Sequence, residues 1–300
     1  MEALSLEDIE HVLILGAGTL GLRVGLQAAL SGYQTVIYEI NSDAVSHAIK
    51  VQDKILKGKV SKGLLKPEEV DAVKGRISFT DDPEQAARDA DFVNESITED
   101  LALKKKVWAQ FGELCPAHTV FTTNTSYLLP SQFAEATGRP ERFAAFHFHD
   151  VFWANVVDVM PHPGTAPWMV DLLVDLGWKL EQTPVVVRKE SPGYIFNAML
   201  IALIGAAGNL VTKDIADFRD IDRSWMGNFK MEVGPFGILD SVGLDTAWHI
   251  LKVRTDSKSI RFAALLQTYI DAGKLGLKSG EGFYSYPDPE FQQPGFVQGT

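Results

Sequence analysis

The stretch from residue 11 to residue 32 reads HVLILGAGTLGLRVGLQAALSG, and it decides the fold class. The apolar run HVLIL is typical of a buried strand, and LRVGLQAALSG has the composition of a helix. Between them the pattern GxGxxG permits a tight turn, a close approach of the backbone to a pyrophosphate, and close packing of the helix on the strand. The loop residues expected at the pyrophosphate are Gly16, Gly18, Thr19, Leu20 and Gly21. The stretch therefore predicts the start of a dinucleotide-binding domain.

An acidic residue ends the second expected strand, QTVIYE, at the position that such a domain requires. Glu39 lies eighteen residues after Gly21, where its carboxylate can accept hydrogen bonds from the adenosine ribose. No Lys or Arg occurs from Tyr38 to Ala48, so a 2'-phosphate would meet no cation. We therefore expect NAD rather than NADP. The alternative is a related domain that uses adenosine for other chemistry, such as methyl transfer.

Short β-rich runs alternate with helical stretches along the first part of the chain. The expected strands are HVLILG, QTVIYE, DFVNES, TVFTTN, RFAAFHF, NVVDVM and PVVV. This alternation predicts a Rossmann-type, doubly wound α/β fold with a mostly parallel sheet. From Ser191 the segment SPGYIFNAMLIALIGAAGNLV predicts a helix with Ser191 as N-cap and Pro192 in its first turn. We expect an NAD-binding domain over residues 1–189 and an all-helical C-terminal domain over residues 190–300.

Composition and charge limit the function. The formal net charge of -11 argues against nucleic acid or an anionic membrane as the main partner. Cys115 is the only cysteine, so no disulfide within the chain is expected. The N-terminus MEALSLEDIEH is acidic where a signal peptide is basic, and the most apolar run, residues 198–207, is too short to span a bilayer. We expect a cytoplasmic protein that acts on a small molecule and holds no metal.

Several separate motifs occur in the order seen in one known family. They are GAGTLG, VNESITEDLALKKKV, TTNTSYLLP, FHF, VVDVMPHP, SPGYIFNAML, GPFGILDSVGLDT and GLKSGEGFYSY. With them the chain resembles the L-3-hydroxyacyl-CoA dehydrogenases from about His11 to Tyr286. The resemblance implies an N-terminal NAD domain, a helical C-terminal domain that usually forms a homodimer, and oxidation of a 3-hydroxyacyl thioester to its 3-oxo form.

The resemblance also implies a set of site residues. Those that match the family's catalytic positions are Ser126 in the NTS segment, His147, and Asn197 after the PGY motif; Glu99 matches an acid near the active site and Lys104 a lysine at the cofactor. The family's histidine is held by a glutamate. Here the aligned acid is Asp158, one residue closer along the chain and one methylene shorter.

Our hypothesis is a dyad of His147 and Asp158. Imidazole suits a general base near neutral pH, and a carboxylate on its far nitrogen fixes the tautomer and stabilises the imidazolium that forms. The structural alternatives are a hydrogen-bonded histidine at a strand end for His147 and a capping or turn role for Ser126. His149 shares a strand face with His147 and is the second choice as base.

Two further features concern the substrate. Asp150 stands where the family has asparagine, and a carboxylate cannot donate the hydrogen bond of an amide. We expect Asp150 close to the substrate, where it would favour a neutral or cationic acyl group. Residues 50–76 carry a local charge of +4, and the family's corresponding helical hairpin contacts the phosphates of CoA. Lys54 and Lys57 are our candidates for that contact, and a solvated helix face is the alternative.

The leading functional prediction is NAD-dependent oxidation of a short-chain L-3-hydroxyacyl-CoA, such as 3-hydroxybutyryl-CoA. The first alternative is a dehydrogenase of a free 3-hydroxy acid, because VVDVMPHPGT is also similar to a segment of the carnitine and gulonate dehydrogenases. The second alternative is a non-catalytic NAD-binding relative, like the lens crystallins related to this fold. Turnover of thioesters and of free acids distinguishes the three.

Overall fold

The computed structural model describes residues 3–299 and divides the chain into two compact units. The first unit ends at Ile195, and the second begins at Phe196. The boundary expected near residue 189 falls between the last strand, β8 (Thr183–Val186), and this division. Each unit has its own hydrophobic core, so each is described by itself.

The first unit contains an eight-stranded sheet in the order β3-β2-β1-β4-β5-β6-β7-β8. The other strands are β1 (His11–Leu15), β2 (Gln34–Tyr38), β3 (Ile77–Thr80), β4 (Phe92–Glu95), β5 (Val120–Thr123), β6 (Phe143–Phe148) and β7 (Val156–Pro161). Neighbouring strands from β3 to β6 are parallel, β7 is antiparallel to β6, and β8 is parallel to β7. The predicted Rossmann-type, mostly parallel sheet is confirmed.

None of the expected strands corresponds to β3, which is one of the two edge strands of the sheet. Its four residues, ISFT, include no fully buried side chain. A short, half-buried edge strand has neither the apolar run nor the clear alternation from which strands are predicted.

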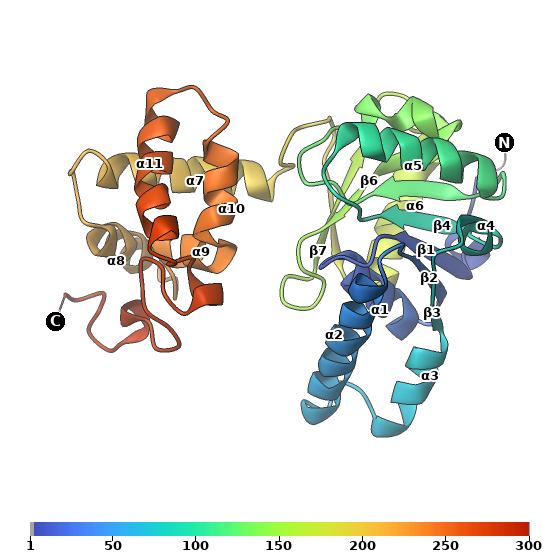
Figure 1. Ribbon diagram of the computed structural model, residues 1–300, viewed down its shortest axis with the longest axis horizontal. Coiled ribbons are helices and arrows are strands. Elements are labelled where there is room, and N and C mark those ends of the chain that lie inside the picture. Colours follow the sequence, from blue (N-terminus) through green and yellow to red (C-terminus); the bar gives the residue numbers. More distant parts are fainter. Residues whose placement is uncertain (1–2, 300) are drawn as a thin grey trace. The chain divides into compact units, whose positions relative to one another are not determined.

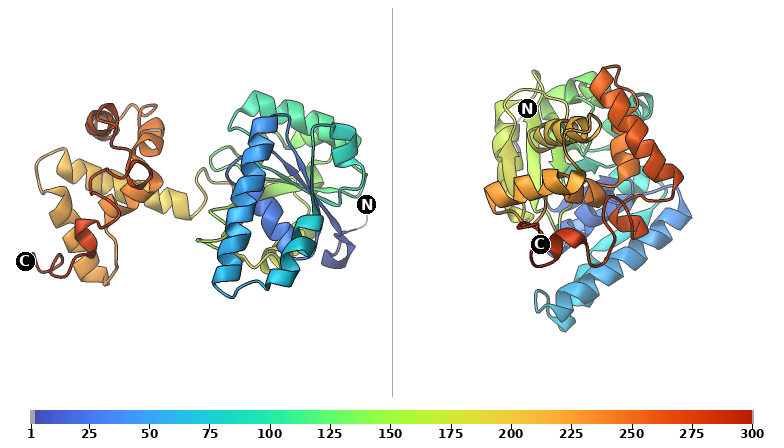
Figure 2. Two further views of the ribbon diagram at one scale, coloured as in Figure 1. Left: turned by 60° about the horizontal axis from the view of Figure 1, so that its bottom comes forward. Right: turned by 90° about the vertical axis from the view of Figure 1, so that its left-hand side faces the viewer.

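Helices cover both faces of this sheet. Alternate residues of β1 show the two layers: Val12 and Ile14 pack in one cluster with α1 (Gly21–Leu30) and α6 (Pro167–Lys179), and Leu13 and Leu15 in another. This second cluster includes side chains of α4 (Pro83–Ala87) and α5 (Leu101–Leu114). The helices α2 (Ser42–Ser61) and α3 (Val70–Gly75) extend from the sheet as a pair (Figures 1 and 2).

The second unit is helical, as predicted. It comprises α7 (Phe196–Val211), α8 (Phe218–Phe229), α9 (Pro235–Val242), α10 (Leu244–Leu251) and α11 (Ser257–Asp271). Two aspartates are buried in its core. Asp222 accepts from the N–H groups of Phe236 and Gly237 and from the hydroxyl of Tyr284, and Asp240 accepts from backbone N–H groups of the C-terminal segment. Within residues 3–299 no helix is long and apolar enough to cross a bilayer.

Short 3-10 turns complete the two units. They are η1 (Leu6–Asp8), η2 (Pro67–Glu69), η3 (Pro130–Gln132), η4 (Ala134–Thr137), η5 (Pro140–Arg142), η6 (Leu277–Ser279) and η7 (Glu290–Gln292).

The predicted helix start at Ser191 and Pro192 is wrong, because α7 begins at Phe196. Gly193 and Tyr194 have φ values of 78° and 53°, in the left-handed region, which a right-handed helix cannot include. The Tyr194 N–H instead donates to Ser191 O at 3.0 Å and closes a turn. This turn directs the Tyr194 side chain into the site described next.

Candidate active site

The glycine loop after β1 has the close contacts that its sequence pattern requires. Gly16 has a φ of 101°, and a Cβ there would lie 2.9 Å from Ser96 O. A Cβ on Gly21 would lie 2.0 Å from Gly16 O, so only glycine allows α1 to begin so close to the strand. At Gly18 the nearest such atom is 4.0 Å away, which leaves the backbone of Gly18, Thr19 and Leu20 approachable at the start of α1.

Glu39 lies beside this loop. Its Oε2 accepts a hydrogen bond from Ala17 N–H at 2.9 Å, and its Oε1 accepts one from Asn41 N–H at 3.0 Å. Each carboxylate oxygen keeps a second lone pair that can accept from a ribose hydroxyl. The glycine cradle, the helix N-terminus and the fixed carboxylate together fit a bound NAD.

The central pair of the site is His147 on β6 and Asp158 on β7. These residues are directly opposite each other in the antiparallel register, and His147 Nδ1 lies 3.1 Å from Asp158 Oδ2. Both are buried, with 2% and 1% of their surface exposed. Because the register places the residues face to face, the short aspartate side chain reaches the imidazole.

Ser126 approaches the other side of the same ring. It follows β5, whose carboxyl end lies at the same sheet edge as that of its parallel neighbour β6. The distance from Ser126 Oγ to His147 Nε2 is 3.2 Å. Since a carboxylate only accepts hydrogen bonds, Nδ1 carries the proton toward Asp158, and the lone pair of Nε2 faces Ser126.

The charges of this pair suit a base and its supporting acid. Burial lowers the pKa of His147, and the hydrogen bond to Asp158 only partly opposes this, so the imidazole is neutral at pH 7. Burial raises the pKa of Asp158, but hydrogen bonds from His147 and His149 outweigh it and hold the pKa below its ordinary value. The site therefore holds a neutral imidazole beside an ionised carboxylate.

Two residues that the sequence analysis did not assign to the dyad complete its surroundings. His149 Nε2 lies 3.0 Å from Asp158 Oδ2, the same oxygen that His147 contacts. Tyr194 stacks on His147, with ring centroids 4.5 Å apart and planes inclined by 7°, and its hydroxyl donates to Thr125 O at 2.7 Å. The shared strand face indicated the place of His149, whereas no sequence pattern indicated that of Tyr194.

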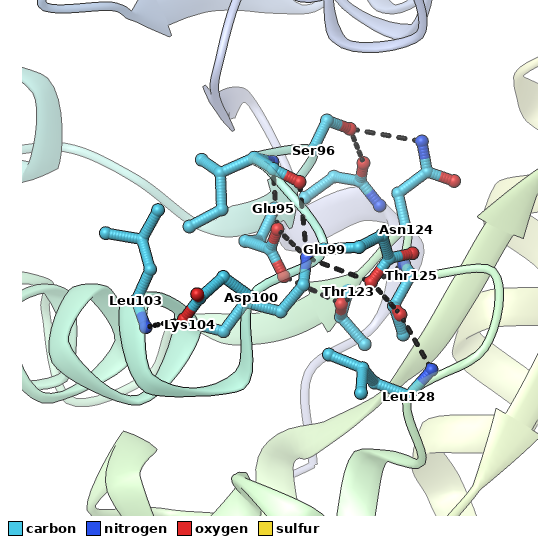
Figure 3. A network of polar contacts seen from close by, with 12 residues as sticks. Glu95, Ser96, Glu99, Asp100, Leu103, Lys104, Thr123, Asn124, Thr125 and Leu128 are labelled. Carbon is cyan, nitrogen blue, oxygen red and sulfur yellow. Dashed lines mark hydrogen bonds and ion pairs between the residues drawn. The ribbon is translucent and has the colours of Figure 1, made fainter. Parts of the chain in front are cut away.

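Glu99 supports the turn after β5, and Figure 3 shows it beside Thr125 of that turn. Its Oε1 accepts from Ser126 N–H at 2.6 Å, and its Oε2 accepts from the Thr125 hydroxyl at 2.6 Å. In turn, Thr125 Oγ1 accepts from Leu128 N–H at 3.1 Å. Glu99 thus positions the backbone of Ser126.

Lys104 lies in the same network but is 1% exposed. Its Nζ is 2.5 Å from Glu95 Oε1 at the end of β4 and also donates to Ile97 O at 3.3 Å. Burial raises the pKa of Glu95, and the Lys104 ammonium opposes this by stabilising the carboxylate. Glu95 was not among the predicted site residues, although an acidic residue at the end of an apolar strand could have indicated it.

Four further candidates belong to other segments of the chain. Asp150 forms an ion pair with Arg23 of α1, and its Oδ1 also accepts from Trp153 N–H at 3.0 Å. Asn197 lies in the first turn of α7, in the second unit, and its role stays a prediction. Lys54 and Lys57 are exposed on α2.

Lys57 borders a hollow of about 400 Å³ between α2 and α3. Apart from Lys57, the hollow is lined by Leu56, Val60, Val70, Pro67, Ser61, Asp53, Asp71 and Lys74. Lys74 Nζ and Asp53 Oδ1 form an ion pair at 2.5 Å. Among the charged residues of this lining, Lys57 is the cation for which no ion pair is found in the described part of the chain.

Fold and site define a Rossmann-type protein with a dinucleotide cradle and a histidine–carboxylate base at the carboxyl edge of its sheet. Residues 11–191 match the family model of the 3-hydroxyacyl-CoA dehydrogenase NAD binding domain, and residues 193–286 match that of the C-terminal domain. The chain belongs to the 3-hydroxyacyl-CoA dehydrogenase family. It is an NAD-dependent oxidoreductase.

Similar proteins agree with this assignment. A probable 3-hydroxybutyryl-CoA dehydrogenase of Bacillus subtilis strain 168 is 32% identical over 286 residues, covering 94% of this chain and 99% of that protein. The mitochondrial hydroxyacyl-coenzyme A dehydrogenase of Sus scrofa is 30% identical, covering 93% and 91%.

Solved structures extend the comparison. A diketoreductase, solved in a study of substrate-directed dual catalysis of dicarbonyl compounds, has 39% identity and a TM-score of 0.88, covering 93% of this chain and 99% of that one. The (S)-3-hydroxybutyryl-CoA dehydrogenase PaaH1 from Ralstonia eutropha has 27% identity and a TM-score of 0.82, covering 93% and 100%.

Proposed function

We propose that this protein oxidises a short-chain L-3-hydroxyacyl-CoA, such as 3-hydroxybutyryl-CoA, to the 3-oxoacyl-CoA. The observation that carries the proposal is the hydrogen-bonded series Ser126–His147–Asp158 at the carboxyl edge of the sheet that bears the glycine loop. The names of the relatives from Bacillus subtilis and Ralstonia eutropha support the substrate class.

The residues have distinct roles in this reaction. NAD, when bound, supplies the nicotinamide ring that accepts a hydride. The Nε2 lone pair of His147 takes the proton of the substrate hydroxyl, and the Ser126 hydroxyl hydrogen-bonds the substrate oxygen. Asp158 stabilises the imidazolium that forms in its buried position. General-base catalysis of this kind contributes about 10²- to 10⁴-fold in rate.

Other residues bind rather than react. We assign Glu99 to holding the backbone of Ser126, and the Lys104–Glu95 pair to holding the loop after β4 near the cofactor cradle. Asn197 is proposed as a second polar contact to the substrate. Lys54 and Lys57 are proposed to contact the CoA phosphates, with support from the apolar hollow that Lys57 borders.

A second candidate is turnover of a free dicarbonyl compound or 3-hydroxy acid without CoA. Its specific support is the 39% identity to a diketoreductase, which exceeds the identities to the CoA dehydrogenases named above. The ion pair of Asp150 with Arg23 also distinguishes this site from one that carries the family's asparagine.

The test is to follow NADH oxidation with acetoacetyl-CoA, free acetoacetate, dehydrocarnitine and a simple diketone. Turnover of the thioester alone supports the CoA proposal, and turnover of free compounds alone supports the second candidate. The double variant Lys54→Glu, Lys57→Glu should raise KM for acetoacetyl-CoA at least tenfold and leave any turnover of free acetoacetate unchanged. A matched control, the double variant Lys105→Glu, Lys179→Glu on α5 and α6, makes the same charge change away from the hollow. If none of these substrates is turned over, the result favours a non-catalytic NAD-binding protein.

We also propose a homodimer and a cytoplasmic location. The homodimer rests on the family resemblance of the helical domain, and it predicts a mass near twice 33.0 kDa in light scattering. The location rests on the single cysteine, which leaves no disulfide within the chain to require an oxidising compartment, and cell fractionation tests it.

A further inference from the structure

A second imidazole shares the carboxylate of the catalytic pair. Asp158 Oδ2 lies 3.1 Å from His147 Nδ1 and 3.0 Å from His149 Nε2. The rings of the two histidines are 4.8 Å apart and inclined by 73°. The dyad needs only one histidine on this oxygen, so the role of the second calls for an explanation.

The three donor atoms have the spacing of a metal site. They all lie within 4.8 Å of one another. Zinc bonds of about 2.0–2.2 Å to nitrogen and oxygen place neighbouring ligands of a tetrahedron about 3.3–3.6 Å apart. For an ion to enter, the two nitrogen–oxygen distances need to widen by a few tenths of an ångström, and the nitrogen–nitrogen distance, which is within 4.8 Å, needs to fall in this range.

The surroundings favour a borderline-soft ion over a hard one. Two imidazoles and one carboxylate are a donor set for Zn²⁺ and its first-row neighbours, whereas Mg²⁺ and Ca²⁺ require mostly oxygen. His147 and Asp158 are held on paired strands, and Tyr194 stacks on the His147 ring and limits its rotation. The His149 side chain is 11% exposed and that of Asp158 is 2% exposed, so an ion would enter from the side of His149.

We propose that His147, His149 and Asp158 form a binding site for one divalent transition-metal ion such as Zn²⁺. The bound ion inhibits the enzyme. The metal bonds to the lone pair of His147 Nδ1, so the ring proton moves to Nε2. Nε2 then presents an N–H toward Ser126 in place of the lone pair that accepts the substrate proton. Metal binding and general-base catalysis exclude each other at this histidine.

The binding half of this inference does not depend on the reaction, and the inhibition half rests on the proposed function. Binding is therefore measured first, on the full chain after treatment with EDTA. Titration with Co²⁺ should produce visible absorption bands of a nitrogen-coordinated ion at one ion per chain, and Zn²⁺ should abolish them. Failure of Co²⁺ to give such bands overturns the proposal without recourse to any variant.

Variants then locate the site. His149→Phe should weaken Zn²⁺ binding at least about 100-fold, since loss of even a supporting contact costs 10- to 100-fold. His249→Gln removes an exposed histidine of the second unit and should bind Zn²⁺ as the parent does. Equal affinity in parent and His149→Phe, with both folded by circular dichroism, overturns the assignment.

Inhibition is measured on whichever substrate the enzyme turns over. Zn²⁺ should inhibit the parent reversibly on addition of EDTA, Mg²⁺ should not, and His149→Phe should retain its own residual activity in Zn²⁺. If one ion binds at these residues and the enzyme is not inhibited, the claim that metal binding and catalysis compete for His147 is overturned. Absence of turnover with intact Co²⁺ binding refutes the proposed function instead.

Discussion

Replacing Asp158 by asparagine tests the central claim about the site. The substitution keeps the size of the side chain and removes its charge. Asp158 Oδ2 lies 3.1 Å from His147 Nδ1, and both residues are buried. The variant therefore removes the group that fixes the tautomer of His147 and balances the imidazolium that forms during oxidation.

The size of the effect follows from the geometry. Two unit charges about 4 Å apart interact by roughly 4 kcal/mol at an effective dielectric constant of about 20. Each 1.36 kcal/mol is a factor of ten in rate, so we expect Asp158→Asn to lower kcat/KM by about 10³-fold. Most of the loss should appear in kcat, because the charge on His147 develops only as the reaction proceeds.

The assay is the NADH-linked reaction on the substrate identified above, with NADH affinity measured separately by fluorescence. Asp150→Asn is the matched control, because it makes the same substitution eight residues away, at a carboxylate that pairs with Arg23. It should lower kcat/KM less than tenfold. A loss below fivefold in Asp158→Asn, or an equal loss in Asp150→Asn, would refute the claim that Asp158 supports the base.

Three other predictions concern the cradle, the stacked ring and the second unit. Gly21→Ala should weaken NADH binding at least tenfold and lower Tm, because its Cβ would lie 2.0 Å from Gly16 O; Gly75→Ala, where no atom lies within 4 Å, should change neither. Tyr194→Phe keeps the ring on His147 but loses the hydroxyl donor, so it should cost about 1 kcal/mol in urea unfolding and less than tenfold in kcat, whereas Tyr194→Ala should lower kcat further. Burial raises the pKa of the Asp222 carboxyl from 3.8 to about 6, so the folded state holds the carboxyl proton more tightly than the unfolded state does. The contribution of Asp222 to the free energy of unfolding therefore falls as the pH rises from about 4 to about 6. Asp222→Asn should therefore lose less stability than the parent between pH 4 and pH 6, and equal losses in urea titrations would contradict the role of this carboxyl.

The amino-acid sequence determined the fold class and most of the residues that meet at the site. The glycine pattern, the alternation of strands and helices, and Glu39 after β2 are local features, because turns, periodicity and strand ends depend on neighbouring residues. The family motifs then placed Ser126, His147 and an acid after it in order along the chain. The same local reasoning misplaced the start of α7, because the left-handed conformation of Tyr194 has no signature in the residue type.

Only the tertiary structure decided which of these side chains touch. Whether Asp158 could reach His147 depended on the register of β6 and β7, which is set by two strands that pair through space. The same register brings His149 to the same oxygen, and the turn before α7 brings Tyr194 onto the ring. Asp150 is next to the histidines in the sequence, yet its charge is paired with Arg23, 127 residues away along the chain. Contacts between distant residues and the burial that shifts a pKa are properties of packing, and a single sequence read locally does not contain them.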